Sequence, residues 1–115
     1  MDVLIFKEKS FICSYNGGLI TTSYEDLLAI ECDKPLVRFR LKKSTLSVAT
    51  TLCKILNHLS MPFVRVNRQV IVNMALAKQL VDNKDGYWIL LQGDLVYKIS
   101  VRQIKIVRSS FIKYT

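Results

Sequence analysis

The chain has 115 residues, half of them hydrophobic, and a formal net charge of +8 from 17 basic and nine acidic residues. This length predicts one domain, 1–115, with a hydrophobic core large enough to fold without disulfide bonds or a bound metal. The three scattered cysteines and the single histidine argue against a disulfide framework or a zinc site. The cysteines are expected to be reduced, mostly buried thiols of a cytoplasmic protein, since the sequence has neither a secretory signal nor an apolar run of roughly 18 residues that could span a membrane.

The first predicted element is a β-hairpin. Two β-prone runs, 11–15 and 18–22, flank Asn16-Gly17, and both turn residues accept the positive φ angles of a type I′ turn. Residues 1–10 precede the hairpin as an N-terminal extension that could stay disordered. A third strand is predicted over 27–32, and it ends before Pro35 because proline cannot donate to a β-ladder.

The runs 36–41 and 45–49 predict an antiparallel pair of strands joined by a basic turn. Apolar and polar residues alternate along 36–41, which places Arg38 and Arg40 on one face. These two arginines could follow a phosphate backbone, or they could be only the solvated side of a sheet. The residues themselves leave both interpretations open.

A helix of about ten residues is predicted next, capped by Thr50 or Thr51. Its apolar side chains recur at the spacing of one helical face, which predicts a stripe directed at the core: Leu52, Ile55, Leu56 and Leu59. His58 lies off this stripe and is expected to be exposed. It is therefore not a candidate for catalysis.

Residues 63–74 are the most distinctive stretch of the chain. Polar and apolar residues alternate in its first half and 70–72 is wholly β-branched, so two strands are predicted around Asn67-Arg68-Gln69. A basic, hydrogen-bonding turn between two strands either binds an anionic partner or is an ordinary surface turn. Asn73 ends the second strand and is expected to bond backbone groups where the chain turns.

The segment 75–81 fits a short helix or a strand, and one turn followed by a strand is favoured. A further hairpin is predicted from 87–91 and 95–99, which flank Gln92-Gly93-Asp94. The predicted fold class is therefore mainly β: antiparallel sheets of about eight to ten short strands, one mid-chain helix and a short C-terminal helix.

The last helix is predicted to begin with a capping box, because Ser100 and Gln103 have the required spacing. It would extend from Val101 to about Phe111. Its inward face would hold apolar residues and its outward face basic ones: Ile104, Val107 and Phe111 or Ile112 inside, and Arg102, Lys105 and Arg108 outside.

Basic residues are segregated from acidic ones. The segment from Lys34 to Val81 contains nine basic residues and no acid, and the segment from Leu95 to Thr115 contains five more without an acid. Such a distribution favours a polyanion, and above all nucleic acid, as the partner, although a solvated basic face would also keep a protein soluble. The sequence has no glycine-rich phosphate loop, paired-carboxylate motif or nucleophile near the histidine, so no enzyme, cofactor or metal site is predicted.

In this context, two motifs resemble the LytTR family of DNA-binding domains: Phe63-x-Arg65-Val66-Asn67-Arg68-x-x-Ile71-Val72-Asn73-Met74, and Ser100-Val101-Arg102 before the last helix. The resemblance covers nearly the whole chain, from about Phe11 to Ile112. This sequence departs from the family pattern at Asn67, where the family usually has histidine, and at Gln69, where it usually has serine. The family usually has two consecutive arginines at the start of the last helix, whereas this sequence has only Arg102.

The resemblance implies a mostly antiparallel β fold that binds double-stranded DNA through loops. In the family, two loops enter successive major grooves and a third reaches the backbone of the minor groove between them. Carried over by position, Lys34 in the loop 32–36 and Arg102 would read bases, whereas Asn67, Arg68 and Lys105 would contact the backbone. Arginine suits the first role because it bonds guanine O6 and N7 bidentately.

The same resemblance implies a cytoplasmic bacterial transcription regulator of the two-component type, with double-stranded DNA as its partner. A homodimer on repeated sites and a receiver domain or sensor protein are further expected partners, and no membrane is expected. The chain contains no receiver segment, so it would be a stand-alone regulator or the output part of a response regulator.

Two other classes of function stay open. A small β module could bind a protein partner or small ligand, its basic face serving solubility, and aromatic residues gathered around an apolar pocket would favour this alternative. Single-stranded nucleic acid would instead require exposed aromatic residues among the basic ones, and it ranks third.

Overall fold

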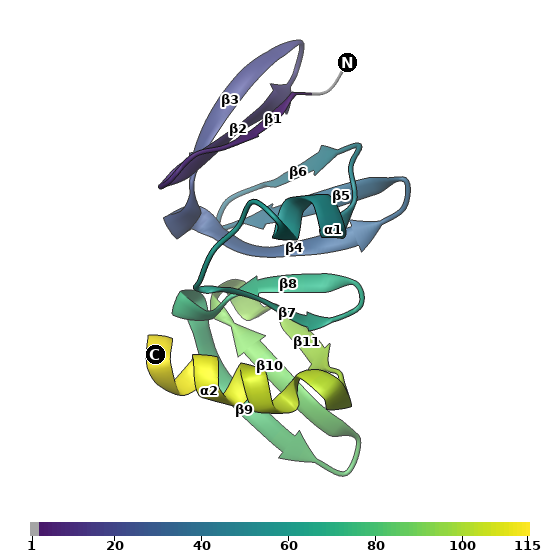
Figure 1. The fold of residues 1–115 in the computed structure, drawn as a ribbon, viewed down its shortest axis with the longest axis vertical. Helices are drawn as coiled ribbons and strands as arrows, with labels where there is room; N and C mark the ends of the chain where they lie inside the picture. Colours follow the sequence, from purple (N-terminus) through teal and green to yellow (C-terminus); the bar gives the residue numbers. More distant parts are fainter. Residues whose placement is uncertain (1–2) are drawn as a thin grey trace.

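The computed structural model describes residues 3–115, which form three antiparallel β-sheets and two α-helices (Figure 1). The first sheet consists, in spatial order, of β1 (Leu4–Phe6), β2 (Ser10–Tyr15) and β3 (Gly18–Ser23). The second consists of β6 (Thr45–Val48), β5 (Leu36–Leu41), β4 (Leu27–Asp33), β8 (Val70–Asn73) and β7 (Phe63–Asn67). The third consists of β11 (Val96–Ile99), β10 (Gly86–Leu91) and β9 (Ala77–Asn83).

The helices are α1 (Leu52–Leu56) and α2 (Ile104–Tyr114). Short 3-10 turns join several of the strands and precede α2: Tyr24–Asp26, Met74–Leu76, Gln92–Asp94 and Val101–Gln103. In the described part of the chain, neither helix is long and apolar enough to cross a membrane.

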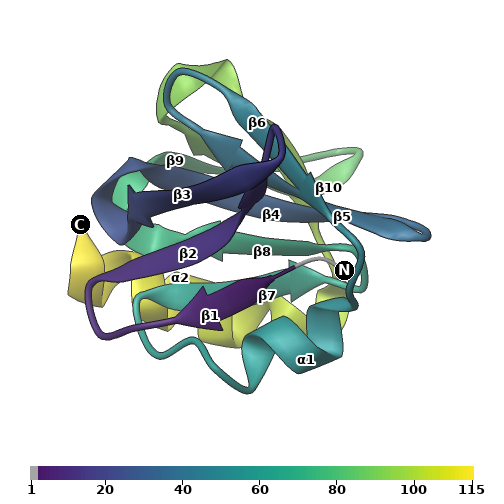
Figure 2. The ribbon, with the colours of Figure 1, turned by 90° about the horizontal axis from the view of Figure 1, so that it is seen from above.

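The five-stranded sheet is the middle layer of the molecule. The first sheet and α1 cover one of its faces, and the third sheet and α2 cover the other (Figures 1 and 2). Successive side chains of a strand point to opposite faces, so Ala29 and Ile30 of β4 belong to two different apolar clusters. The layers stack along the longest dimension of a molecule that measures 45 × 26 × 24 Å.

The two apolar clusters explain why β4 and β8 are so hydrophobic. A strand that is buried on both faces cannot alternate with polar residues. Ile30 and Ile71 pack in the cluster beneath the first sheet, where the rings of Phe11 and Phe39 stack with centroids 4.9 Å apart. Val72 packs on the opposite face, against residues of the third sheet and α2.

Most of the strand predictions are confirmed, and so is the mainly β fold class. Asn16 and Gly17 have φ angles of 47° and 79°, as a type I′ turn requires, and they join β2 to β3. The strand predicted over 36–41 is β5. After Asn73 the chain makes one 3-10 turn and continues as β9, as favoured from the sequence.

Asn73 bonds backbone groups as expected. It is 3% exposed, and its side-chain amide donates to the carbonyl oxygens of Tyr24 and Leu27 at 3.1 and 3.0 Å. Its Oδ1 accepts from the Ala75 amide at 3.1 Å. The side chain therefore fastens the end of β8 to the segment that enters β4.

The mid-chain helix is shorter than predicted. α1 has five residues rather than about ten, and Thr51 Oγ1 caps it by accepting from Lys54 N at 3.3 Å. Asn57 and His58 have low helix propensity, which explains the early end. His58 is exposed as expected, and its ring stacks on Phe6 with centroids 5.6 Å apart.

Two further expectations need correction. The described residues contain eleven strands rather than eight to ten, because β1 pairs with β2 inside the stretch taken as an extension. Met1 and Asp2 of that stretch lie outside the described residues. The cysteines are less buried than expected: Cys13 is buried, Cys32 is half-buried and Cys53 is exposed.

Candidate nucleic-acid interface

Three connections that the sequence singled out lie along one side of the molecule. They are the β4–β5 turn with Lys34, the β7–β8 turn with Arg68, and the segment between β11 and α2 with Arg102, all on the right-hand side of Figure 1. Two backbone hydrogen bonds join them: Cys32 N donates to Gln69 O at 2.8 Å, and Ser100 N donates to Val66 O at 2.9 Å. The fold thus brings the three predicted loops together, with the β7–β8 turn between the other two.

The β7–β8 turn is held from inside by two side chains. Arg65 Nε donates to Asn67 O at 3.2 Å, and its Nη2 donates to Arg68 O at 2.5 Å. Asn67 Oδ1 accepts from Gln69 N at 2.8 Å, while its Nδ2 donates to Lys98 O at 2.7 Å. Asn67 thus ties the turn to β11, and its half-buried amide keeps one N–H for another partner.

Arg68 projects from this turn. Its side chain is exposed, and it has no hydrogen bond or ion pair within residues 3–115. Since the backbone of the turn is fixed by Arg65 and Asn67, the guanidinium is presented from a defined position. A free guanidinium on a rigid turn can bind a phosphate oxygen or a base edge.

The capping box predicted at the start of the last helix is wrong. Ser100 has the extended backbone of an N-cap residue, but its hydroxyl makes no capping hydrogen bond. Gln103 Nε2 donates to Arg65 O at 3.0 Å instead, so this side chain fastens the start of the helix to β7. As a result Val101–Gln103 is a 3-10 turn, and α2 proper begins at Ile104.

The basic residues of this segment face solvent. Arg102 lies in the 3-10 turn and Lys105 in the first turn of α2, and both are exposed, as is Arg108. On the inward side of α2, Val107 is buried and Phe111 is half-buried. The choice left open between Phe111 and Ile112 is settled in favour of Phe111, because Ile112 is 76% exposed.

The β4–β5 turn carries one exposed base next to one exposed acid, Lys34 and Asp33. Asp33 Oδ2 lies 3.7 Å from Arg38 Nη1. Lys34 has no ion pair in the described part of the chain, so its ammonium is available to a partner.

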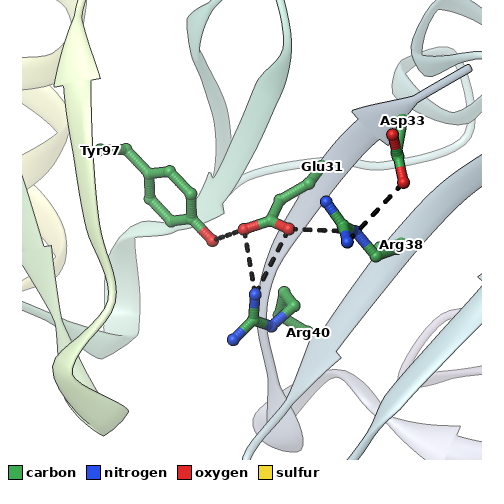
Figure 3. A network of polar contacts seen from close by, with 5 residues as sticks. All are labelled: Glu31, Asp33, Arg38, Arg40 and Tyr97. Atoms are coloured by element: carbon green, nitrogen blue, oxygen red, sulfur yellow. Dashed lines mark hydrogen bonds and ion pairs between the residues drawn. The ribbon is translucent and has the colours of Figure 1, made fainter.

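The two arginines of β5 are paired with an acid inside the protein (Figure 3). Arg38 Nε and Arg40 Nη1 each lie 3.4 Å from Glu31 Oε1, and the Glu31 side chain is only 15% exposed. Tyr97 of β11 donates its hydroxyl to Glu31 Oε2. Burial raises the pKa of Tyr97 well above its ordinary value, and the hydrogen bond and negative charge of Glu31 raise it further.

The sequence left Arg38 and Arg40 either following a phosphate backbone or on the solvated side of a sheet, and neither interpretation included an acidic partner for them. Glu31 is directly opposite Arg38 in the β4–β5 register, and a tight turn at 34–35 would have indicated that cross-strand pair from the sequence. The hydroxyl of Tyr97 comes from a strand of another sheet, and no local pattern indicates its contact.

The features that would favour a small-ligand site are weak. A cavity of about 790 Å³ lies between the first sheet and the segment that joins α1 to β7. Its lining includes the aromatic residues Tyr24 and Phe63, but none of Tyr15, Tyr87, Trp88 and Tyr97, which would also have to gather there to favour a ligand site. Among residues 3–115 no group of three or more metal-ligating side chains is found.

Comparisons with known proteins agree with this geometry. The family model described as the LytTr DNA-binding domain matches residues 17–111. Among solved structures, the chain is similar to the LytTr DNA-binding domain of a protein from Bacillus cereus described as a methyl-accepting/DNA response regulator. That similarity has a TM-score of 0.77 at 15% sequence identity, and it covers 90% of this chain and 97% of the other. Among curated proteins there is no significant match.

Proposed function

The chain belongs to the LytTR family of DNA-binding domains, and we propose that it is a transcription regulator that binds double-stranded DNA sequence-specifically through its three turns. The observation that carries the proposal is that the three turns that carry Lys34, Arg68 and Arg102 lie on one side of an elongated molecule. The three turns follow one another along the longest dimension of the molecule (Figure 1).

In this proposal the outer two turns read bases. Arg102 enters a major groove and bonds guanine bidentately, and Lys34 reaches the neighbouring major groove. Both side chains are exposed, and neither has an ion pair among residues 3–115, so binding to DNA breaks no internal ion pair.

The central turn, between β7 and β8, contacts the sugar–phosphate backbone of the DNA. Arg68 bonds a phosphate oxygen, and Lys105 adds a phosphate contact from the first turn of α2. Asn67 has two roles in this proposal: its amide holds the turn against β11, and its remaining N–H donates to the DNA backbone. The same N–H explains how an asparagine can stand where the family usually has histidine.

Pairing of two copies on repeated sites, and a receiver domain or sensor protein as a further partner, stay predictions from the family resemblance. The alternative function is a small β module that binds a protein partner or a small ligand. It would use a region such as the 790 Å³ cavity, and the basic side would then serve solubility.

Titration against random duplex DNA at several salt concentrations tests the proposal. If about four to six phosphates are neutralised, the logarithm of the affinity falls against the logarithm of salt with a slope of roughly −4 to −5. Lys113→Ala controls for the effect of net charge alone. It removes one positive charge from the last turn of α2, at the end of the helix remote from the three turns.

The control variant is expected to keep the slope of the unmodified protein. Absent binding, or an affinity that does not change between low and physiological salt, would contradict the DNA proposal and favour the protein-partner or ligand alternative.

A further inference from the structure

The Glu31 network connects two sheets that carry different base-reading turns. Glu31 lies on β4 shortly before Lys34, and Tyr97 lies on β11 shortly before Arg102. Figure 3 shows Tyr97 reaching from its strand to the carboxylate that Arg38 and Arg40 also contact. One side-chain contact therefore joins the strands that lead into the two outer turns, β4 and β11, without passing through the β7–β8 turn.

The other contacts between these sheets lie in an apolar cluster or at the edge strand β7. The cluster between them consists of apolar side chains, including Ala29, Val72 and Ile99, and hydrophobic contact is non-directional. Three hydrogen bonds act at the edge strand β7: Ser100 N donates to Val66 O, Asn67 Nδ2 to Lys98 O and Gln103 Nε2 to Arg65 O. The hydrogen bond between Tyr97 and Glu31 adds a directional constraint at β4, an interior strand of the five-stranded sheet, away from the contacts at β7.

We propose that Tyr97 and Glu31 are positioning residues that fix the Lys34 and Arg102 turns relative to each other, and so set the number of base pairs that the domain accepts between its two contacted segments. The inference rests on the proposed function and deepens it, because it assigns the spacing requirement to named side chains that do not touch DNA.

Glu31 has a second consequence for specificity. The side chains of Arg38 and Arg40 are 43% and 36% exposed, so both could reach phosphates if no acid held them. Phosphate contacts carry no sequence information, and two more would strengthen binding to any duplex. By holding both guanidinium groups, Glu31 limits binding that does not depend on the two base-reading turns.

The test compares Tyr97→Phe with the unmodified protein and with the control Tyr87→Phe. Both variants lose a tyrosine hydroxyl from the third sheet, but Tyr87 lies on β10 and is not part of the network. The DNA is a duplex selected by the unmodified protein from a random library. The positions at which Lys34→Ala and Arg102→Ala lose base preference define its two contacted segments, and one base pair is then inserted between them.

For the unmodified protein and Tyr87→Phe, the insertion is expected to weaken binding by about tenfold or more, because it displaces one base-reading turn from its contact. For Tyr97→Phe, the factor by which the same insertion weakens binding should be at least about threefold smaller than for the unmodified protein. The affinity of this variant for random duplex should be unchanged. A loss of folding alone would lower binding to every duplex by one factor, so the ratio between the two sites separates positioning from stability.

Glu31→Gln provides a second measurement that does not depend on the tyrosine variant. It is expected to reduce the effect of the insertion in the same way, and also to raise affinity for random duplex a few-fold, because Arg40 loses its acidic partner and Arg38 keeps only the contact with Asp33 at 3.7 Å.

Three results would overturn the inference. Variants that fold and keep the unmodified ratio would show that the network does not set the spacing. An unmodified protein that binds the selected site and tolerates the insertion equally well would refute the inference and leave the proposed function intact. No duplex binding by the unmodified protein would refute both.

Discussion

Arg38 and Arg40 of β5 carry the same charge as Arg68 and Arg102 of the turns, but their settings differ. The first pair lies within ion-pair distance of Glu31, whereas the second pair is exposed and has no acidic partner in the part of the chain that the structure describes. A net charge of +8 counts all four equally. The difference shows that the location of the acids determines which basic residues are free to meet a polyanion.

The comparison yields an experimental distinction. Side chains whose polar groups are satisfied inside the protein should affect stability when they are replaced. Exposed cations without partners should affect DNA binding and leave stability nearly unchanged. Each of the following experiments could separate the two groups or show that the distinction fails.

The largest effect on DNA binding is expected for Arg102→Ala. Loss of a bidentate guanine contact should weaken binding to a selected site by about 1 to 3 kcal/mol and binding to random duplex much less. Parallel titrations of both duplexes measure the specificity ratio. A ratio equal to that of the unmodified protein would place Arg102 among the backbone contacts or bystanders.

The largest effect on stability is expected for Asn73→Ala. The substitution leaves the carbonyl oxygens of Tyr24 and Leu27 and the amide of Ala75 without their present partner. Thermal or denaturant unfolding should show a loss of about 1 to 3 kcal/mol. An unchanged melting temperature together with lost DNA binding would move Asn73 from the satisfied group to the interface.

A smaller and more uniform effect is expected for Arg68→Ala. Because a phosphate contact carries no sequence information, affinity should fall by the same factor on selected and random duplexes, and the salt slope should decrease by about one. The unfolding midpoint should not change, since the side chain has no hydrogen bond within residues 3–115. Undiminished binding to random DNA would remove Arg68 from the backbone contacts.

The smallest effect concerns Tyr97 at alkaline pH. Burial raises the pKa of its phenol above the ordinary 10.0, as do the hydrogen bond to Glu31 and its charge, whereas Arg40 and Arg38 act in the opposite direction. Above pH 10.0 the unfolded chain therefore loses this proton while the folded chain retains it, and the stability that depends on the neutral phenol declines as pH rises.

Unfolding free energies at about pH 9 and about pH 11 measure this decline. Between them, the protein should lose about 1 kcal/mol relative to Tyr97→Phe, which has no ionisable ring. Parallel pH curves for the two proteins would show that Tyr97 is not held in the neutral form by its surroundings.

Local patterns were sufficient to predict most of the β structure. The type I′ turn at Asn16-Gly17 and strand β5 follow from residues that are neighbours in the chain. β1 was missed because three residues are too short for a periodic pattern. The capping box failed because Gln103 found a tertiary partner, the carbonyl oxygen of Arg65, which lies in a strand far from it in sequence.

The same limit applies to the candidate site. Lys34, Arg68 and Arg102 were indicated by charge and by the family resemblance, and the fold places their turns on one side. Glu31 and Tyr97 were not singled out, because their contact joins residues 66 positions apart on different sheets. Contacts of this kind depend on how the layers stack, and periodicity carries no information about that.

The hydrogen bonds that Arg65 and Asn67 make to the β7–β8 turn also bear on the thermodynamics of association. A turn whose backbone is already held loses little conformational entropy when a ligand arrives, so less of the interaction free energy is spent on ordering the protein. Binding at this turn should then lack the large negative heat-capacity change that accompanies coupled folding. The internal bonds of Asn67 thereby give the domain a recognition element that is ready before its partner is present.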